Sequence, residues 1–466
     1  MGKYFFLTLF YLSFIFLSSC SDRKREAYKE SLSTDFSILQ DDEKFLNTLQ
    51  YHTFLYFLSE SNPENRLIKD RSTSYSPASI AATGFAYPVW IIGAHHGWIS
   101  REIAAEWTLT SLKFFLHSEQ STASDATGYK GFFYHFLDMK TGKRVWNCEL
   151  STIDTAWLIG GMRISAQYFD RTNSTETLIR EIADSLTYQI DWEWATLPDT
   201  GIYASTISMG WTAKEGFNPL GWTGYNEALY LYILAAGSGY KGAERAYRQW
   251  LSTYQWEESY PGLAHAIFPP LFGHQFSHLF IDFRELPDAY MQGKGIDYFE
   301  NSRRAVYTQR QYAIQNPFHW VGYDSLTWGI SACDGPGEKY NTGKYHFYGY
   351  AGRGSSGPSH VFFDDGTIAC YASAASLPFA PEIVLPTLKS MYKRFAEAGL
   401  WNTYGFVDAF NLTANWFDTD YLGIDQGPIV IMIENYRTGL IWNLAMRDSL
   451  IQRGLQILGY HKTTSP

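Results

Sequence analysis

The sequence predicts an all-α protein built as an (α/α)6 barrel, a toroid in which an outer ring of helices wraps an inner ring. Segments of helical period recur along the 466 residues, and apolar segments alternate about six times with amphipathic ones. A helix that is hydrophobic all round is buried, whereas an amphipathic helix faces solvent on one side, so the two kinds suit two concentric rings. No Pro/Ser/Gly-rich linker interrupts residues 41–466, which favours a single domain.

The expected helices alternate along the chain. The apolar segments assigned to the inner ring cover residues 77–97, 152–168, 225–238, 275–284, 366–377 and 426–434. The other predicted helices cover residues 41–59, 100–118, 174–194, 242–254, 298–315 and 382–396, and a last helix runs to about residue 458. An irregular array of helical repeats, such as a tetratricopeptide solenoid, is the alternative, but no period of about 34 residues is visible.

Long loops rich in Gly, Trp and Tyr separate several of these helices, and residues 128–147 are expected to form a small β-hairpin. Loops of this length in a compact domain usually carry function. The main loops cover residues 119–149, 195–224, 255–274, 317–364 and 397–425.

Composition narrows the function. Aromatic residues make up 18% of the chain, as much as all charged residues together, and the formal net charge is −10. Nucleic-acid binders and proteins that bind anionic membrane surfaces carry a basic balance or basic stripes, so both classes are disfavoured. A neutral ligand fits this composition better than a polyanion.

The first residues are typical of a bacterial lipoprotein signal. Lys3 precedes an apolar run over residues 4–17, which is too short to span a membrane, and Leu17-Ser18-Ser19-Cys20 resembles a lipobox. We therefore expect a signal peptide over residues 1–19, lipidation of Cys20 and a flexible tether over residues 20–40. The expected location is the bacterial cell envelope, in the periplasm or on the outer-membrane surface. An ordinary secretory signal with an incidental Cys is the alternative.

The remaining cysteines and the paired histidines do not indicate a metal site. Cys148, Cys333 and Cys370 form no CxxC motif, so we expect small buried residues, with one disulfide pair left open. His274 and His278 have i,i+4 spacing but no HExxH motif and no nearby acidic third ligand. No cofactor and no metal are predicted.

Acidic residues recur where the inner helices begin. They are Asp154, Glu227, the pair Asp364-Asp365, and Asp425. Any one of them could simply cap a helix N-terminus. If the inner helices run parallel, however, their N-termini converge and the carboxylates ring one pocket. Two carboxyl groups in such a pocket, one protonated and one ionised, are what glycoside hydrolysis requires.

Aromatic and polar loop residues supply candidate sugar contacts. Apolar sugar faces stack on aromatic rings, and indole N–H and phenol O–H groups bind hydroxyls. Core packing is the alternative for the rings, and a buried hydrogen-bonded role is the alternative for His274 and Gln275. Arg353 could hold a substrate hydroxyl or a catalytic carboxylate. The candidate substrate-binding residues are Glu149, Trp222, Tyr225, His274, Gln275, Trp328, Asp334, Arg353, Trp416 and Gln426. Further loop rings expected on the same side are Trp211, Trp320, Tyr345, Tyr348, Tyr350 and Trp401.

Several long stretches resemble the bacterial glucoamylase-like family, which is similar to the endo-β-1,2-glucanases and sophorose-releasing enzymes. They include GWTGYNEALYLYILAAGS, PLFGHQFSHLFIDFR, WGISACDGPG, DDGTIACYASAASLPF and YGFVDAFNLTANWFDTDYLGIDQGP, and they run in order from about residue 149 to 446. The resemblance implies an (α/α)6 barrel and metal-free, inverting hydrolysis of glucosidic bonds. It implies Glu227 as the acid and acidic roles for Asp154 and Asp425. Cys370-Tyr371 stands where the family pattern has Pro-Thr, so glycan preference can differ.

The sequence thus favours an inverting glycoside hydrolase that acts, as a monomer, on a glucan or gluco-oligosaccharide with β-1,2 linkages. Glu227 is the expected general acid and Asp425 the expected base, with support from Asp154 and Glu149. A non-catalytic glycan-binding lipoprotein is the main alternative, because the same rings would serve it. A polysaccharide lyase is disfavoured, because the chain is acidic overall and its loops have few Arg and Lys residues to neutralise a uronate.

Overall fold

The computed structural model of the chain describes residues 34–462, and the predicted signal peptide, Cys20 and most of the predicted tether lie outside the described residues. The tether prediction extends too far, because the 3-10 helix η1 (Phe36–Gln40) already belongs to the domain. Ile38 is buried in the core, and the ring of Phe36 contacts that of Tyr392. The folded part therefore begins a few residues before position 41.

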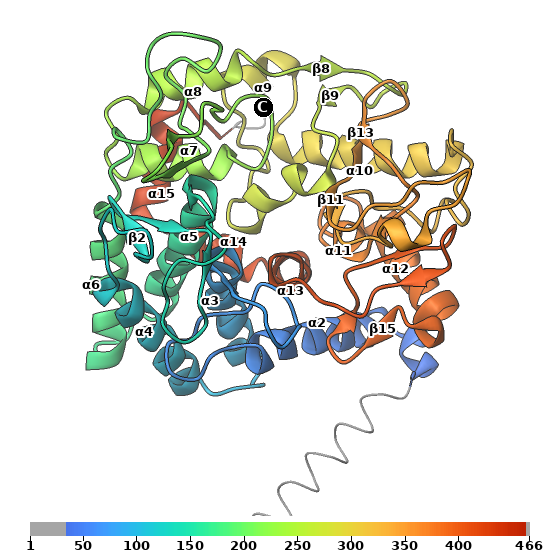
Figure 1. The fold of residues 1–466 in the computed structure, drawn as a ribbon, viewed down its shortest axis with the longest axis horizontal. Coiled ribbons are helices and arrows are strands. Elements are labelled where there is room, and N and C mark those ends of the chain that lie inside the picture. Colours follow the sequence, from blue (N-terminus) through green and yellow to red (C-terminus); the bar gives the residue numbers. More distant parts are fainter. Residues whose placement is uncertain (1–33, 463–466) are drawn as a thin grey trace, which may run out of the picture.

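The structure confirms the (α/α)6 barrel. The inner helices are α3 (Ile80–His95), α5 (Thr152–Tyr168), α7 (Leu229–Gly237), α11 (Cys370–Ala374) and α13 (Gly423–Arg437). The outer helices are α2 (Asp42–Ser59), α4 (Arg101–His117), α6 (Ser174–Tyr188), α8 (Ala243–Leu251), α10 (Tyr298–Gln315) and α12 (Pro381–Phe395). Outer helices lie along the rim of the molecule and α13 is seen end-on towards the middle (Figure 1). Three more helices, α9 (Ala289–Lys294), α14 (Leu440–Ala445) and α15 (Ser449–Ile457), complete the described part.

Burial separates the two rings as the sequence pattern predicts. Every residue of α7 is buried. In α8 only Ala243, Ala246, Tyr247 and Trp250 are buried, which is the spacing of one helix face. Close packing in the inner ring depends on glycine: a Cβ at Gly161 would lie 2.0 Å from the carbonyl oxygen of Gly84, so α3 and α5 touch backbone to backbone.

The predicted helix over residues 275–284 is wrong. The sixth inner position holds two 3-10 helices instead, η2 (Leu271–His274) and η3 (Phe276–Leu279). Polar side chains there bind neighbouring elements: Gln275 donates to the carbonyl oxygen of Ala372, and Ser277 donates to that of Glu227. These tertiary contacts hold a shape that a continuous helix would not permit. The last predicted helix is divided into α14 and α15, and the segment 366–377 contains strand β14 before the short helix α11. The other predicted helices are present with some shifted ends, although α9 was not predicted.

Short antiparallel strands form small sheets over the barrel. The largest sheet has the order β2-β3-β5-β6-β7, and its β2–β3 hairpin lies in the first part of residues 128–147, where a hairpin was predicted. Strands β1, β5 and β14 run directly into α3, α5 and α11. The strands are β1 (Ala78–Ser79), β2 (Gly128–Tyr129), β3 (Phe132–Tyr134), β4 (Phe136–Leu137), β5 (Leu150–Ser151), β6 (Gly210–Thr212), β7 (Gly216–Phe217), β8 (Trp256–Glu257), β9 (His265–Ala266), β10 (Ala332–Cys333), β11 (Ala351–Gly352), β12 (Gly354–Ser355), β13 (Val361–Phe363), β14 (Ile368–Ala369), β15 (Trp401–Asn402), β16 (Gly405–Phe406), β17 (Ala409–Asn411) and β18 (Trp416–Phe417).

The structure also settles the state of the cysteines among the described residues. Cys148, Cys333 and Cys370 are buried and free, so the disulfide pair left open by the sequence does not form among them. Over residues 34–462, each helix is too short or too polar to cross a membrane.

Candidate active site

The N-termini of the inner helices converge on one cavity of about 530 Å³. Ser79 caps α3, Asp154 stands in the first turn of α5, and Glu227 lies just before α7. Ile424, in the first turn of α13, also lines the cavity. This convergence is the arrangement that the sequence predicted from the placement of the carboxylates. The remaining lining residues are Asp70, Arg71, His135, Phe136, Trp146, Ile153, Trp157, Phe272, Phe276, Tyr350 and Leu422.

Glu227 has the properties of a proton donor. Its backbone carbonyl accepts a hydrogen bond of 2.8 Å from Ser277, which fixes the loop, while its buried Oε2 atom has no protein partner. Burial, and secondly the nearby Asp154 carboxylate, raise the pKa of Glu227 to about 7. A carboxyl group with such a pKa is still substantially protonated near neutral pH, and its free oxygen points to a role outside the packing of the protein.

His135 organises the carboxylates on the same side of the cavity. Its Nδ1 atom lies 2.9 Å from Oε1 of Glu149, and its Nε2 atom lies 3.6 Å from Oδ2 of Asp154. Burial works against a charged imidazole, but the two carboxylates outweigh it and raise the pKa of His135 to about 9. The imidazolium in turn lowers the pKa of Glu149 against the effect of burial. Burial still raises the pKa of Asp154. We call these three residues the His135 cluster.

A second group of acids lies beneath the N-terminus of α13. Asp425 is 3% exposed, and its carboxyl group lies beside that of Asp408, which is 1% exposed. Burial, and then Asp408, raise the pKa of Asp425 well above its usual range, while burial and Asp334 raise that of Asp408 to about 7. Two carboxyl groups in contact do not both ionise readily, so the pair holds one proton and one negative charge. Leu422 and Ile424, on either side of this position in the chain, line the cavity.

Arg71 supplies the positive charge on this side. Its Nη1 atom lies 2.8 Å from Oδ2 of Asp334 and 3.4 Å from Oδ2 of Asp420, and its Nε atom lies 3.5 Å from Oδ2 of Asp70. The backbone N–H of Asp334 donates to Oδ2 of Asp408 at 2.8 Å, which joins this network to the carboxyl pair. Asp334, Asp408, Asp425, Asp420 and Arg71 form the Arg71 cluster.

Acidic groups lie at distances that a cation could bridge in the His135 cluster, and also where Asp418 joins two acids of the Arg71 cluster. The ligand atoms of His135, Glu149 and Asp154 lie within 4.8 Å of one another, and so do those of Asp334, Asp408 and Asp418. A protein cation already accompanies each group, because His135 belongs to the first and Arg71 bonds to Asp334 in the second. The residues present therefore balance part of the negative charge without a further ion.

The structure brings some of the predicted site residues together and separates others. Asp154 and Glu227 line the cavity, and Glu149 pairs with His135 beside it. Asp334 and Asp425 belong to the Arg71 cluster, of which Arg71 itself lines the cavity. The predicted substrate contacts of several rings and amides require correction, because these side chains are buried and most of them bond to protein partners. Trp222 donates to Thr152 Oγ1, Trp328 donates to Thr387 Oγ1, and Gln275 donates to Ser376 Oγ. Tyr225, His274 and Gln426 are likewise buried outside the cavity lining, and Trp416 is partly buried outside it.

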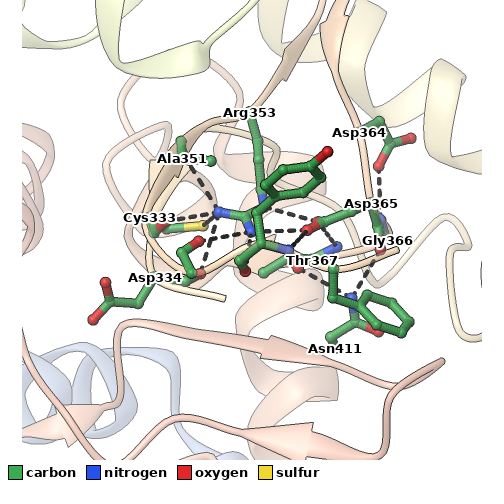
Figure 2. Close-up of polar contacts among 12 residues, drawn as sticks. Cys333, Asp334, Ala351, Arg353, Asp364, Asp365, Gly366, Thr367 and Asn411 are labelled. Carbon is green, nitrogen blue, oxygen red and sulfur yellow. Dashed lines mark hydrogen bonds and ion pairs between the residues drawn. The ribbon is translucent and has the colours of Figure 1, made fainter. Parts of the chain in front are cut away.

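Arg353 needs a separate correction, because its guanidinium is completely buried and fully engaged by the protein (Figure 2). Nε and Nη2 donate to the two carboxylate oxygens of Asp365 at 2.8 Å each, and Nη1 donates to the carbonyl oxygen of Cys333 at 2.7 Å. Further bonds reach the carbonyl oxygens of Tyr348 and Gly349. Arg353 therefore fastens the long loop that carries Asp334, and it does not contact the cavity.

The pair Asp364-Asp365 does not join the ring of cavity carboxylates either. Asp364 accepts hydrogen bonds of 2.8 Å from the hydroxyls of Tyr312 and Tyr323, while Asp365 pairs with Arg353. Both carboxylates bind protein partners and thereby hold the surrounding loops in place. The expectation that all the acidic positions converge is thus wrong for this pair.

Sequence reasoning missed several residues of the site. His135 is the polar residue in an aromatic run, FFYHF, on the predicted hairpin. A polar side chain at that place could have indicated a functional residue. Asp70 and Arg71 lie in a polar loop, where nothing in the local sequence separates them from other surface charges. Asp408 precedes a β-strand and becomes significant only through its contact with Asp425. Trp146 was missed as well, whereas Tyr350, one of the loop rings expected near the site, does line the cavity.

Comparisons with known proteins agree with this architecture. The Glycoamylase family model matches residues 219–449. A crystal structure of a candidate glucoamylase from Bacteroides uniformis is 32% identical, with a TM-score of 0.77, and the match covers 91% of this chain and 98% of that one. The endo-β-1,2-glucanase of Chitinophaga pinensis is 28% identical, with a TM-score of 0.77 and coverage of 90% and 99%.

A curated relative gives a further comparison. The exo β-1,2-glucooligosaccharide sophorohydrolase of Parabacteroides distasonis is 27% identical over 452 residues, covering 89% of this chain. The chain spans 58% of the length of that relative. The match to the Bacteroides uniformis structure, in sequence and in barrel architecture, extends over nearly the whole described part. The chain therefore belongs to the glucoamylase-like family.

Proposed function

We propose that the chain is a glycoside hydrolase that cleaves β-1,2-linked glucans or gluco-oligosaccharides with inversion at the anomeric carbon. The activities of the Chitinophaga pinensis and Parabacteroides distasonis relatives support the linkage. The cavity supports a sugar ligand, because aromatic rings from Phe136, Trp146 and Tyr350 line it together with acids.

One observation carries the proposal: Glu227 presents an unpartnered, desolvated carboxyl group to the cavity, with its pKa raised to about 7. General acids in glycosidases need a carboxyl group that stays protonated near the working pH. Asp154 and Glu149, by contrast, pair with His135. Glu227 is therefore the acid, and the His135 cluster keeps a negative charge beside it that disfavours loss of its proton.

The reaction follows from these assignments. Glu227 gives its proton to the glycosidic oxygen as the bond between that oxygen and the anomeric carbon breaks. A water molecule attacks the anomeric carbon from the opposite face, and its proton passes to the ionised member of the Asp408–Asp425 pair, with Asp425 as the base. One water is consumed, and the new hydroxyl has the inverted configuration.

A panel of α- and β-linked glucans tests the proposal with the chain lacking residues 1–19. Product sizes and the anomeric configuration of the first product, followed by NMR, should show inverted products from β-1,2-glucan. Glu227→Gln should fold normally and lower kcat by about 10³–10⁴-fold. Glu244→Gln on the surface of α8 serves as the matched control and should keep wild-type activity.

Two results would contradict the assignment. Near wild-type activity of Glu227→Gln would remove this residue from the mechanism. Binding of β-1,2-glucan without cleavage of any glucan would instead support a glycan-binding lipoprotein.

We also propose that the protein is a monomer anchored to the bacterial envelope through lipidated Cys20. The order of Lys3, an apolar run and a Leu-Ser-Ser-Cys sequence supports the anchor. Labelled fatty acid should be incorporated into the wild type and not into Cys20→Ala, and light scattering of the soluble chain should give the monomer mass. Label in Cys20→Ala, or a dimer mass, would contradict the respective part.

A further inference from the structure

Trp146 stands apart from the other tryptophans. The residue is 61% exposed, and no other tryptophan among residues 34–462 is largely exposed. It lies in the loop between β4 and β5, next to the His135 cluster in the chain. Among the other rings that line the cavity, Trp157 and Phe276 are buried, Phe136 and Phe272 are partly buried, and Tyr350 is 58% exposed.

The Trp146 ring stands on a turn whose backbone conformation is unfavourable for a large side chain. Trp146 and Asn147 have φ angles of 57° and 50°, and the N–H of Cys148 donates to the carbonyl oxygen of Val145 at 3.2 Å. Two successive positive φ angles within such a four-residue turn are typical of type I′ turns, which favour Asn and Gly. The left-handed conformation is sterically unfavourable for a residue such as Trp, whose Cβ crowds the following carbonyl oxygen. A smaller residue would form this turn more easily, so the indole serves something other than the turn.

Neighbouring contacts hold the turn in place. Val145 N–H donates to the carbonyl oxygen of Phe136 at 3.1 Å, and Arg144 Nε donates to that of Cys148 at 2.6 Å. The Trp146 ring packs against Phe136 with centroids 5.1 Å apart, and Phe136 stacks on His135 at 3.9 Å. The exposed indole is therefore fixed to the His135 cluster through one intervening ring.

Trp146 also borders two cavities. It lines the active-site cavity and a second cavity of about 540 Å³. Polar groups of Asn62, Lys69 and Asp138 line this second cavity, together with Tyr75, which is 82% exposed. Hydroxyl-binding groups beside exposed rings are suited to a neutral sugar chain.

We propose that Trp146 is the stacking platform of a sugar subsite, over which a glucan chain passes from the active-site cavity into the second cavity. The subsite takes a neutral pyranose ring, whose apolar face lies on the indole. The inference rests on the proposed hydrolysis of β-1,2-glucan and adds that the bound substrate extends beyond the catalytic pocket.

Steady-state kinetics of Trp146→Ala and Trp146→Phe test the subsite with β-1,2-linked substrates from the shortest cleaved oligosaccharide to the polymer. We expect Trp146→Ala to raise KM for the polymer by about tenfold, in line with the loss of one aromatic stacking contact, and to raise it less as the substrate shortens. Trp146→Phe should retain most of the affinity. Asn147→Gly keeps the ring and favours the turn, so it is the matched control and should behave as wild type.

Binding measurements separate failure of the subsite from failure of the enzyme assignment. Calorimetric titration of Glu227→Gln with the polymer should give affinity that Glu227→Gln/Trp146→Ala loses by about tenfold. If the wild type cleaves β-1,2-glucan but Trp146→Ala shows the same polymer preference, the subsite is wrong and the function stands. If the wild type neither cleaves nor binds β-1,2-glucan, both proposals fall.

Discussion

The His135 cluster and the Arg71 cluster lie at the same cavity and contain the same kind of residue, yet they hold protons differently. In the first, the imidazolium of His135 lies between Glu149 and Asp154, and its charge stabilises their ionised forms. Glu227 has no such partner, and burial raises its pKa to about 7. The carboxyl group left without a cation is the one suited to donate a proton.

In the Arg71 cluster the cation is engaged by other acids. Arg71 contacts Asp334, Asp420 and Asp70, while Asp425 and Asp408 contact each other. The buried pair therefore shares a proton and keeps one negative charge, which can accept a proton from water. The partner of each carboxyl group, more than its residue type, therefore sets its chemical role.

Replacing a member of the Asp408–Asp425 pair should have the largest effect, and the effect is on activity. Asp425→Asn should lower kcat by about 10³–10⁴-fold, because the base is lost. Asp408→Asn should retain more activity but lower the pKa of Asp425, because a neutral amide replaces a competing carboxyl group and can donate to it. Since the base acts when ionised, the acidic limb of the kcat/KM profile should move to lower pH.

The pH profile of kcat/KM for wild type, Asp408→Asn and a surface control, Asp42→Asn on α2, gives this measurement. An acidic limb that stays in place in Asp408→Asn, or moves to higher pH, would show that the two carboxyl groups do not share a proton.

Replacing Arg353, which fastens the loop that carries Asp334, should mainly lower the free energy of unfolding. Arg353→Ala leaves the buried Asp365 carboxylate without its partner, and loss of one member of a buried pair costs about 3–5 kcal/mol. Urea denaturation should show this loss. The double variant Arg353→Met/Asp365→Leu should recover much of it, because no charge remains buried. Equal stability of Arg353→Ala and wild type would mean that the pair does not hold the loop.

The smallest effect is expected at the His135 cluster and concerns the pH dependence of stability. The pKa of His135 in the folded protein is about 9, above its ordinary value of 6.5. Its contribution to stability is therefore fully present below about pH 6.5 and is lost as the pH rises towards 9. In His135→Gln this part of the decline in Tm should disappear, whereas His117→Gln at the exposed end of α4 should keep the wild-type curve. A decline of equal size in His135→Gln would assign it to other groups.

Much of the barrel could be predicted from local patterns. The predicted bounds of α5 and α10 agree with the observed Thr152–Tyr168 and Tyr298–Gln315. The first helix is buried almost throughout and the second on one face, and each kind of burial leaves its own pattern in the sequence. The prediction failed over residues 275–284, where Gln275 and Ser277 bind neighbouring backbones instead of leaving a regular helix. Such contacts involve partners far along the chain, and no local pattern encodes them.

The site divides in the same way. Asp154 and Glu227 could be placed because parallel inner helices must bring their N-termini together, and this geometry follows from the repeated helix pairs. The prediction could not separate exposed from buried tryptophans, so it chose Trp222 and Trp328 and missed Trp146. All three stand in loops, and only the packing around them decides which ring faces a ligand.

The sequence alone determined the alternating helices, the family and the carboxylates at the ends of the inner helices, because these depend on periodicity and on motifs continuous in the chain. The tertiary structure decided the proton states of the acids. It brought Arg71 to Asp334, Asp408 to Asp425 and His135 to Glu149, in contacts that mostly join distant segments. The physical reason is that burial and charge partners set a pKa, and both exist only once the chain has folded.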